Sequence, residues 1–490
     1  MIDSPHSPVL RAIADHAVKT PDKLALVSGP NRVTYAQLMA HVEHAAAYLL
    51  SHGYMKGDYI LLSAQKEVEF VYLYLAAHLL GIVNVVVDSA SPAERLDYII
   101  DIVRPVALFG AGNVTGQHRF TPFQEIPLDD YVDIKPSVPA SDLTQDSVAD
   151  VMFTTGTTGA PKGVCLTHAN IAGSAGNTNG FIGTCADDIE ALALPLSHSF
   201  GLGRMRCVLT VGATLILVSN FANLKAFFTV LAQEHVTGFG MVPAVWQYIK
   251  KLSGRRIAQF APQLRYIELG SAALPVEDKT LLMELFPDTR ICMHYGLTEA
   301  SRAIFSEFHE DAGNLETIGC PASPLVQVQV LDENGGPVAD GVDGEICVRG
   351  NMVTSSYFLA ADNHDSFFND WFRTGDWGHR DAEGKFYLTG RKKELINVGG
   401  EKVSPATIEE AIISLGVSDC ACVAVPDPNG VLGEVPKAFL LKGEGSPSVD
   451  EIKSRLTQFL PAHEIPVQWE WVESLPRTAS GKMQRLKLKR

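Results

Sequence analysis

The sequence has no excess of positive charge and no cysteines at metal-binding spacing. Its 490 residues carry 40 Lys and Arg against 56 Asp and Glu, a formal net charge of −16. That balance argues against a nucleic-acid or anionic-membrane surface. The eight cysteines are scattered, and the one close pair, Cys420 and Cys422, alternates along an apolar stretch. We therefore expect reduced thiols in the core rather than a metal site.

Secretory and membrane-spanning patterns are also lacking. The first residues, MIDSPHSPVL, have neither the basic region nor the apolar core of a signal peptide. The longest apolar run, 71–87, is interrupted by His78, Gly81 and Asn84. This run is better explained as a helix over 67–80 that leads into a buried strand than as a membrane span. We expect a cytoplasmic protein that binds small molecules, as a monomer or homodimer.

The sequence does contain a regular alternation of helical and strand-like segments. From Val33 to Tyr387 it predicts mostly parallel sheets covered by helices. The first helical segments are 35–50 and 68–80, and the first strand-like ones are 59–62 and 82–87. Short strands separated by turns then predict a small antiparallel, barrel-like section. These strands are 326–331, 345–349 and 385–388.

After Arg391 the pattern restarts, with enough residues for a separate small domain. The expected elements are a hairpin around Gly399 and Gly400, a helix over 405–414, strands over 421–425 and 438–441, and a helix over 449–460. We therefore predict an α/β N-terminal domain over residues 1–390 and an α+β C-terminal domain over residues 391–490.

The segment TTGTTGAPKGV, residues 154–164, concentrates glycine, hydroxyl groups and one lysine. Glycines let backbone N–H groups turn toward an anion, and hydroxyls and an ammonium can hold phosphate. The candidate phosphate ligands are Thr154, Thr155, Gly156, Thr157, Thr158, Gly159 and Lys162. An apolar strand over 151–153 and a helix capped by Thr167 predict a strand, loop and helix. Pro161 and Gly163 around the lysine exclude the Walker A pattern, and a Gly/Thr-rich surface turn remains the alternative.

Further motifs follow in order along the chain. They are MHYGLTEAS at 293–301, RTGDWG at 373–378, YLTGRKKELINVGGEKVSP at 387–405 and PRTASGKMQR at 476–485. Together with the Thr-rich segment, these motifs resemble the core motifs of the adenylate-forming superfamily. That superfamily includes acyl-CoA and aryl-CoA synthetases, luciferases and peptide-synthetase adenylation domains. The resemblance runs from Thr34 to Lys482, nearly the whole chain.

The resemblance implies activation of a carboxylic acid by ATP, with pyrophosphate released and an acyl-AMP formed. The Thr-rich segment would hold the β- and γ-phosphates, Thr298 would reach the α-phosphate, and Glu299 would bind Mg²⁺. Without the other motifs, a Thr-Glu pair would be read as a solvated surface or a helix start. The nucleotide would be enclosed by small and aromatic residues and held at its ribose by polar ones. These residues are Gly270, Ser271, Ala272, Ala273, His294 and Tyr295 around adenine, Gly296 as a further nucleotide-binding residue, Asp376 at the ribose, and Arg391 at the ribose or phosphate.

By the same resemblance, Lys482 would bridge the attacking carboxylate and the α-phosphate. Judged alone, it belongs to a basic, solvated C-terminal tail. The C-terminal domain would rotate about Lys393 after adenylation. It would then present Gly399 and Gly400 to the pantetheine thiol of CoA or of a carrier protein.

The acid pocket is expected to be largely apolar, although the same side chains are typical of a core. Its candidate residues are His198, Ser199, Phe200, Met241, Trp246 and Gly270, with His198 as the gate. Arg204 departs from the family pattern, so we hypothesise that it contacts a polar or second acid group. Surface exposure or an internal salt bridge is the alternative. Arg302 is a second candidate for this contact.

These residues favour an acyl- or aryl-CoA ligase that uses ATP, Mg²⁺ and CoA. One alternative is a stand-alone ligase that loads an acyl or aminoacyl group onto a carrier protein's phosphopantetheine. Ser199-Phe200 lacks the aspartate that binds a substrate ammonium in amino-acid-activating domains, which disfavours a free amino acid. A non-catalytic nucleotide-binding relative is the other alternative.

Overall fold

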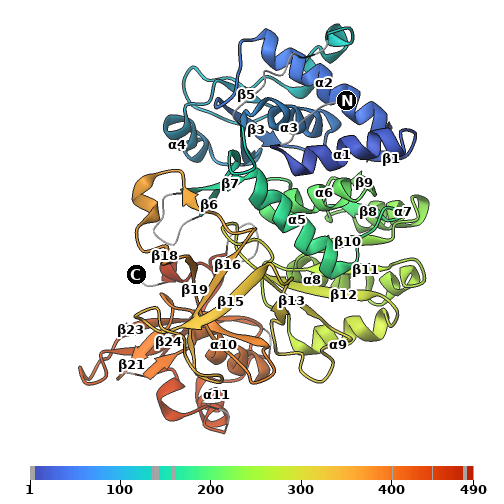
Figure 1. Ribbon diagram of the computed structural model, residues 1–490. Coiled ribbons are helices and arrows are strands. Elements are labelled where there is room, and N and C mark those ends of the chain that lie inside the picture. Colours follow the sequence, from blue (N-terminus) through green and yellow to red (C-terminus); the bar gives the residue numbers. More distant parts are fainter. Residues whose placement is uncertain are drawn as a thin grey trace. The chain divides into compact units, whose positions relative to one another are not determined.

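The computed structural model describes residues 6–134, 136, 143–155, 161–399, 401–443, 445–458, 460–477 and 483–488. The chain forms two compact units (Figure 1). The first consists of Met1–Val328 and Val348–Phe372, and the second of Gln329–Cys347 and Arg373–Arg490. The predicted domain boundary at 390/391, with its hinge at Lys393, stays a prediction.

The first unit contains a six-stranded sheet in the order β17-β7-β6-β4-β3-β5. Its parallel strands are β3 (Tyr59–Ala64), β4 (Val83–Asp88), β5 (Ala107–Phe109) and β6 (Val148–Thr155). Two antiparallel strands complete it, β7 (Pro161–Thr167) beside β6 and β17 (Ser356–Tyr357) beside β7. The segment 161–167 is therefore a strand, whereas the sequence predicted a loop that leads directly into a helix.

Helix α3 (Val68–Leu80) joins β3 to β4 and explains the longest apolar run. Twelve of its thirteen residues are buried, so the helix needs apolar side chains on every face. It ends at Gly81, whose φ of 70° gives the left-handed C-cap. The predicted helix and strand are confirmed, and within the described residues no helix has the length and apolarity needed to cross a membrane.

A nine-stranded sheet forms the rest of the first unit's core. Its order is β14-β13-β12-β11-β10-β8-β9-β1-β2. The central parallel strands are β12 (Arg290–Tyr295), β11 (Tyr266–Leu269), β10 (Gly238–Met241), β8 (Ile189–Leu192), β9 (Thr214–Leu217) and β1 (Leu24–Ser28). The antiparallel edge strands are β2 (Asn31–Thr34), β13 (Ile304–Glu307) and β14 (Cys320–Pro321). Because β10, β11 and β12 are parallel, Met241, Gly270 and Tyr295 all lie at the carboxyl ends of these strands. Ligands of α/β sheets bind at the carboxyl ends.

Helices follow these strands as the alternating pattern predicted. They include α2 (Tyr35–Ser51), α5 (His168–Ile182), α6 (Ser199–Thr210), α8 (Pro243–Ser253) and α9 (Val276–Leu285). The predicted cap of α5 is confirmed, because the Thr167 side chain accepts from the Asn170 N–H and Asn170 reciprocates in a capping box.

The second unit holds most of the antiparallel section and the C-terminal elements. A five-stranded sheet contains β15 (Val326–Leu331), β16 (Gly344–Gly350), β19 (Trp371–Arg380), β18 (Phe367–Phe368) and β20 (Phe386–Arg391), and the chain passes between the units within it. The C-terminal elements are the hairpin β21 (Ile396–Val398) and β22 (Glu401–Val403), helices α10 (Pro405–Ser414) and α11 (Val449–Leu456), and strands β23 (Cys420–Pro426), β24 (Glu434–Leu441) and β25 (Gln468–Val472). The predicted fold class is confirmed in both units.

Candidate active site

The Thr-rich segment connects two strands that pair side by side. Strands β6 and β7 are antiparallel, with Thr154 opposite Lys162 and Phe153 opposite Gly163. Gly156, Thr157, Thr158, Gly159 and Ala160, together with the side chain of Thr155, lie outside the described residues. Gly163 is needed for close packing rather than for a left-handed backbone, because a Cβ there would lie 2.9 Å from the Phe358 side chain.

Lys162 faces an aromatic ring and a carboxylate. Its Nζ lies 3.2 Å from Asp362 Oδ1 and 5.3 Å from the centroid of the Tyr357 ring. The side chain keeps 30% of its surface exposed. The ammonium is therefore held near the start of β7, and a cation in that position can still meet a phosphate.

Tyr357 joins this lysine to Glu299. Its hydroxyl donates to Glu299 Oε1 at 2.8 Å, and the Thr354 N–H donates to the Glu299 carbonyl at 2.8 Å. Burial and the neighbouring Glu299 raise the pKa of Tyr357, so the phenol stays protonated and donates. A continuous line of contacts thus runs from Lys162 through Tyr357 to Glu299. It connects two predicted site residues, Lys162 and Glu299. No sequence motif pointed to Tyr357 or Asp362.

The turn after β11 carries the residues predicted to face adenine. Ser271 has a φ of 75°, a left-handed conformation that costs a non-glycine residue energy and is concentrated at functional sites. Ala272 and Ala273 are exposed, while Tyr295 at the end of β12 and Gly296 and Thr298 after it are half-buried. These positions therefore lie on accessible turns at the carboxyl ends of two neighbouring strands.

His294 packs directly on Gly270. A Cβ at Gly270 would lie 2.2 Å from the imidazole, so glycine makes room here for a side chain of the protein itself. The imidazole Nδ1 lies 2.7 Å from Glu268 Oε1, and burial lowers the pKa of His294 despite that carboxylate. The lowered pKa favours the neutral form of this buried ring.

Most residues predicted for the acid pocket lie at the start of α6 or at the end of β10, whereas Trp246 lies in the core. His198 is the exposed N-cap of α6, Ser199 begins that helix, and Phe200 is buried with its ring 4.5 Å from the His294 ring in an edge-on arrangement. Met241 is buried at the end of β10. Trp246, in contrast, is fully buried on α8 and donates to Asp278 Oδ1 at 2.9 Å, as a core tryptophan does.

Arg204 is an internal ion-pair residue rather than a candidate acid ligand. Its side chain has no exposed surface, and its Nε donates to Glu190 Oε1 at 2.9 Å. Its Nη1 lies 3.3 Å from Glu268 Oε2. The predicted contact with substrate is therefore corrected in favour of the internal salt bridge, because a fully buried guanidinium shared by two carboxylates has no surface to offer an acid. Arg206 is paired in the same way with Asp150, at 2.7 Å.

In the second unit, the predicted ribose residues meet. Asp376 on β19 lies opposite Arg391 on β20, and Arg391 Nε is 2.6 Å from Asp376 Oδ1. The Asp376 side chain is nearly buried and that of Arg391 is 40% exposed. The pair therefore offers one shielded carboxylate and one accessible guanidinium.

The remaining predicted residues lie in the C-terminal part of this unit. Lys393 is exposed in the turn after β20. Gly399 has a φ of 61°, as the turn of the β21–β22 hairpin requires. Gly400 and Lys482 lie outside the described residues.

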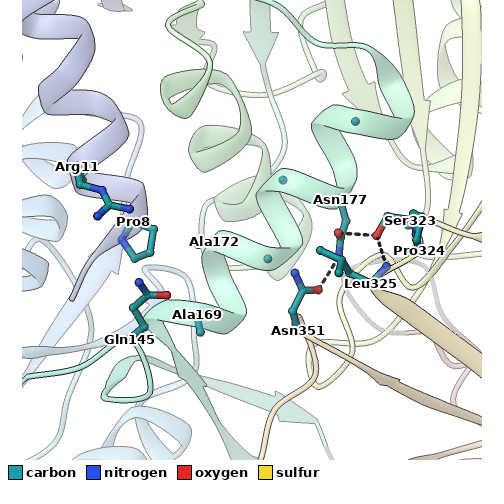
Figure 2. Close-up of a pocket in the computed structure, with 14 residues that line it drawn as sticks. Pro8, Arg11, Gln145, Ala169, Ala172, Asn177, Ser323, Pro324, Leu325 and Asn351 are labelled. Atoms are coloured by element: carbon teal, nitrogen blue, oxygen red, sulfur yellow. Dashed lines mark hydrogen bonds between the residues drawn. The ribbon is translucent and has the colours of Figure 1, made fainter. Parts of the chain in front are cut away.

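A groove of about 910 Å³ runs along α5 in the first unit (Figure 2). Small residues of α5, including Ala172, Gly173 and Gly176, form one side. Its polar side chains already bind each other, with Ser323 Oγ donating to Asn177 Oδ1 at 2.8 Å and Asn177 Nδ2 donating to Asn351 Oδ1 at 2.9 Å. None of the predicted site residues lines this groove.

Comparisons with known proteins agree with the motifs. Residues 13–358 match the AMP-binding enzyme family, and residues 407–482 match the AMP-binding enzyme C-terminal domain. An oxalate–CoA ligase from Arabidopsis thaliana is 31% identical over 494 residues, covering 96% of this chain and 95% of that protein. The 2-succinylbenzoate–CoA ligase of Bacillus subtilis (strain 168) is 30% identical over 487 residues, covering 97% of each.

Solved structures match over almost the full length. ATP-bound MatB from Rhodopseudomonas palustris has a TM-score of 0.88 at 25% identity, covering 99% of this chain and 98% of that chain. The o-succinylbenzoate CoA synthetase MenE from Bacillus subtilis, in complex with its acyl-adenylate intermediate, has a TM-score of 0.85 at 26% identity and covers 98% of each chain. The chain therefore belongs to the AMP-binding enzyme family.

Proposed function

We propose that Lys162, Tyr357 and Glu299 form the phosphate- and metal-binding side of an AMP-forming acid–thiol ligase. The enzyme uses ATP, Mg²⁺ and CoA to convert a carboxylic acid to its thioester. The observation that carries the proposal is the line of contacts from Lys162, through the Tyr357 ring and hydroxyl, to the Glu299 carboxylate. A cation over the Tyr357 ring and a carboxylate at its hydroxyl support the proposal, because a polyphosphate and its metal need groups of both charges.

The described residues fit a magnesium ion that is bound mainly by the nucleotide. In the part of the chain that the structure describes, no group of three or more His, Cys, Asp or Glu could hold a metal by itself. Mg²⁺ commonly binds one or two carboxylates together with substrate phosphates and water. Glu299 meets that need, because Tyr357 uses only part of the accepting capacity of its carboxylate. When bound, the ion would neutralise charge on the phosphates.

The other roles follow the family motifs. Asp376 accepts hydrogen bonds from the ribose hydroxyls, Arg391 meets the ribose or phosphate, and Thr298 meets the α-phosphate. Lys482 stabilises the charge that develops as the carboxylate oxygen attacks the α-phosphorus and pyrophosphate leaves. The thiol then displaces AMP by way of the Gly399–Gly400 hairpin. Holding both steps in one enzyme keeps the reactive acyl-AMP from water.

We propose that the acid carries an apolar group. Phe200 and Met241, from the expected pocket, are apolar, and Arg204 is taken up by internal carboxylates. A second carboxylate on the substrate would then meet no described cation in this set, and leaving a charge unpaired in an apolar site is costly. We also propose a cytoplasmic location, which suits the eight free cysteines.

Acid-dependent exchange of pyrophosphate into ATP tests the function. The panel contains a long-chain fatty acid, a short aliphatic acid, an aryl acid, 2-succinylbenzoate and oxalate. We expect exchange with the apolar monocarboxylic acids, weaker exchange with oxalate, and loss of exchange when Mg²⁺ is chelated. CoA and a phosphopantetheinylated carrier protein are then compared as acceptors for the best acid.

Each outcome of this assay has one meaning. No exchange with any acid would favour a non-catalytic nucleotide-binding protein. If pyrophosphate exchange occurs and a carrier protein is loaded but no CoA thioester forms, the acceptor is the carrier protein and not CoA. A preference for oxalate would contradict the apolar acid.

A further inference from the structure

Arg302 is a fully buried arginine that follows the YGLTE segment. Its backbone has a φ of 57°, and its side chain is 1% exposed. A Cβ at Gly296 would lie 2.4 Å from the Arg302 backbone N, so the segment 296–302 folds back closely on itself. The tight turn that carries Thr298 and Glu299 therefore also holds Arg302 in its buried position.

The guanidinium binds the first turn of helix α6. Its Nη2 donates to the Phe200 carbonyl at 2.8 Å, and Nη1 donates to the Ser199 carbonyl at 3.4 Å. The guanidinium also lies 5.0 Å from the centroid of the Phe200 ring. It thus holds both the main chain and an aromatic side chain of the segment expected to face the acid.

Helix α6 has a glycine where the guanidinium lies. A Cβ at Gly203 would stand 2.4 Å from Arg302 Nη1, closer than such atoms can approach. The helix therefore accepts Arg302 only because residue 203 has no side chain. This fit explains a glycine within a helix, a position where it otherwise costs about 1 kcal/mol.

Glu268 fixes the other side of the guanidinium. Arg302 Nε donates to Glu268 Oε1 at 2.8 Å, and the same carboxylate meets Arg204 and His294. A buried arginine held by a charged partner and by main-chain carbonyls has little freedom to move. The guanidinium is therefore a rigid link between β11, α6 and the turn after β12.

We propose that Arg302 is a positioning residue that aligns the acid-binding turn of α6 with the Thr298–Glu299 segment. This inference rests on the proposed function, because it assigns the acid to one segment and the nucleotide to the other. Correct alignment of two reactants contributes strongly to rate, and a displacement of about 1 Å can cost on the order of 100-fold. Arg302 thus acts through the main chain and contacts neither reactant.

Two variants test this alignment by different means. Arg302→Lys keeps the charge beside Glu268 but loses the forked contact with the two carbonyls. Gly203→Ala leaves every charge in place and pushes the guanidinium away from α6. We expect each to lower kcat/KM for the acid by about 10- to 100-fold, with KM for ATP changed less than about 2-fold.

Matched controls separate alignment from stability. Arg206→Lys changes another buried arginine of α6, which binds Asp150 and Tyr74 instead of the first turn. Gly180→Ala places a methyl group on helix α5 where, apart from the neighbouring residues and backbone of that helix, no atom lies within 4 Å. Both controls should keep the acid kcat/KM per folded molecule. Equal losses in Arg302→Lys and Arg206→Lys would overturn the proposal, as would unchanged kinetics in Gly203→Ala.

Hydrogen exchange gives a readout that does not depend on the reaction. In Arg302→Lys and Gly203→Ala, amide exchange should accelerate together in 199–204 and 296–302, and in neither control. If the wild-type protein catalyses no exchange of pyrophosphate, the proposed function fails while this measurement still decides the alignment. Acceleration confined to one segment would overturn the link between them.

Discussion

Lys482→Ala should lose acid-dependent ATP/pyrophosphate exchange while it still converts a supplied acyl-AMP to the thioester. We expect the adenylation rate to fall at least about 100-fold, the scale seen when one preorganised group that stabilises transition-state charge is removed. The thioester step should stay within about 3-fold of wild type, because that step needs the thiol path and not this cation. Both half-reactions are measured on the same preparation.

The control for this variant is another lysine of the basic C-terminal segment. Lys487 is exposed, so Lys487→Ala should leave both half-reactions unchanged. If Lys487→Ala lost activity like Lys482→Ala, the general charge of the tail would be responsible. If Lys482→Ala lost both half-reactions equally, the two-conformation account would be wrong.

Glu268→Gln should destabilise the first unit by about 3 to 5 kcal/mol, the usual cost of removing one partner from a buried ion pair. Glu268 has no exposed surface, and it lies within 2.8 Å of Arg302, 3.3 Å of Arg204 and 2.7 Å of His294. An amide in its place would remove the carboxylate charge beside Arg302 and leave Arg204 with Glu190. Thermal and chemical unfolding measure the loss.

The pH dependence of this loss has a definite sign. Burial opposes ionisation of Glu268, but Arg302 and Arg204 outweigh it and hold the pKa of Glu268 well below its usual value. A depressed carboxyl pKa contributes stability above the unfolded pKa, near pH 4.5, and loses it as the pH falls. The difference between wild type and Glu268→Gln should therefore be full at pH 7 and shrink below about pH 4.5.

A surface pair provides the comparison. Glu310 is 62% exposed and lies 2.6 Å from Arg290, so Glu310→Gln should cost no more than about 1 kcal/mol. If Glu268→Gln lost no more unfolding free energy than Glu310→Gln, the internal ion-pair network would contribute little to stability. A loss independent of pH would show that the carboxylate charge is not the cause.

Local patterns predicted the secondary structure well because their causes are local. The helix of α3 was predicted over 68–80, the bounds it has in the structure, since its apolar run and Gly81 both act within a few residues. Thr167 was predicted as a cap because its partner, Asn170, is three residues away. In contrast, Pro161–Thr167 was not predicted as a strand, because its pairing with β6 depends on how the intervening loop turns back.

The long-range ionic contacts could not be predicted from the sequence, because their partners lie far apart along the chain. Arg302 and Glu268 are 34 residues apart, and neither belongs to a motif that names the other. A lone arginine near a predicted pocket is compatible with a substrate ligand or with an internal pair, and only burial distinguishes them. Tyr357 was missed because nothing in its short strand indicates the contact with Glu299.

The most direct test of the central claim follows an oxygen atom. An active acid is labelled with ¹⁸O in its carboxylate, converted to the thioester with ATP and CoA, and the nucleotide product is analysed by mass spectrometry. Attack of the carboxylate on the α-phosphorus predicts AMP that carries one ¹⁸O atom, with unlabelled pyrophosphate. Formation of ADP with ¹⁸O in inorganic phosphate, or of AMP without label, would contradict the account.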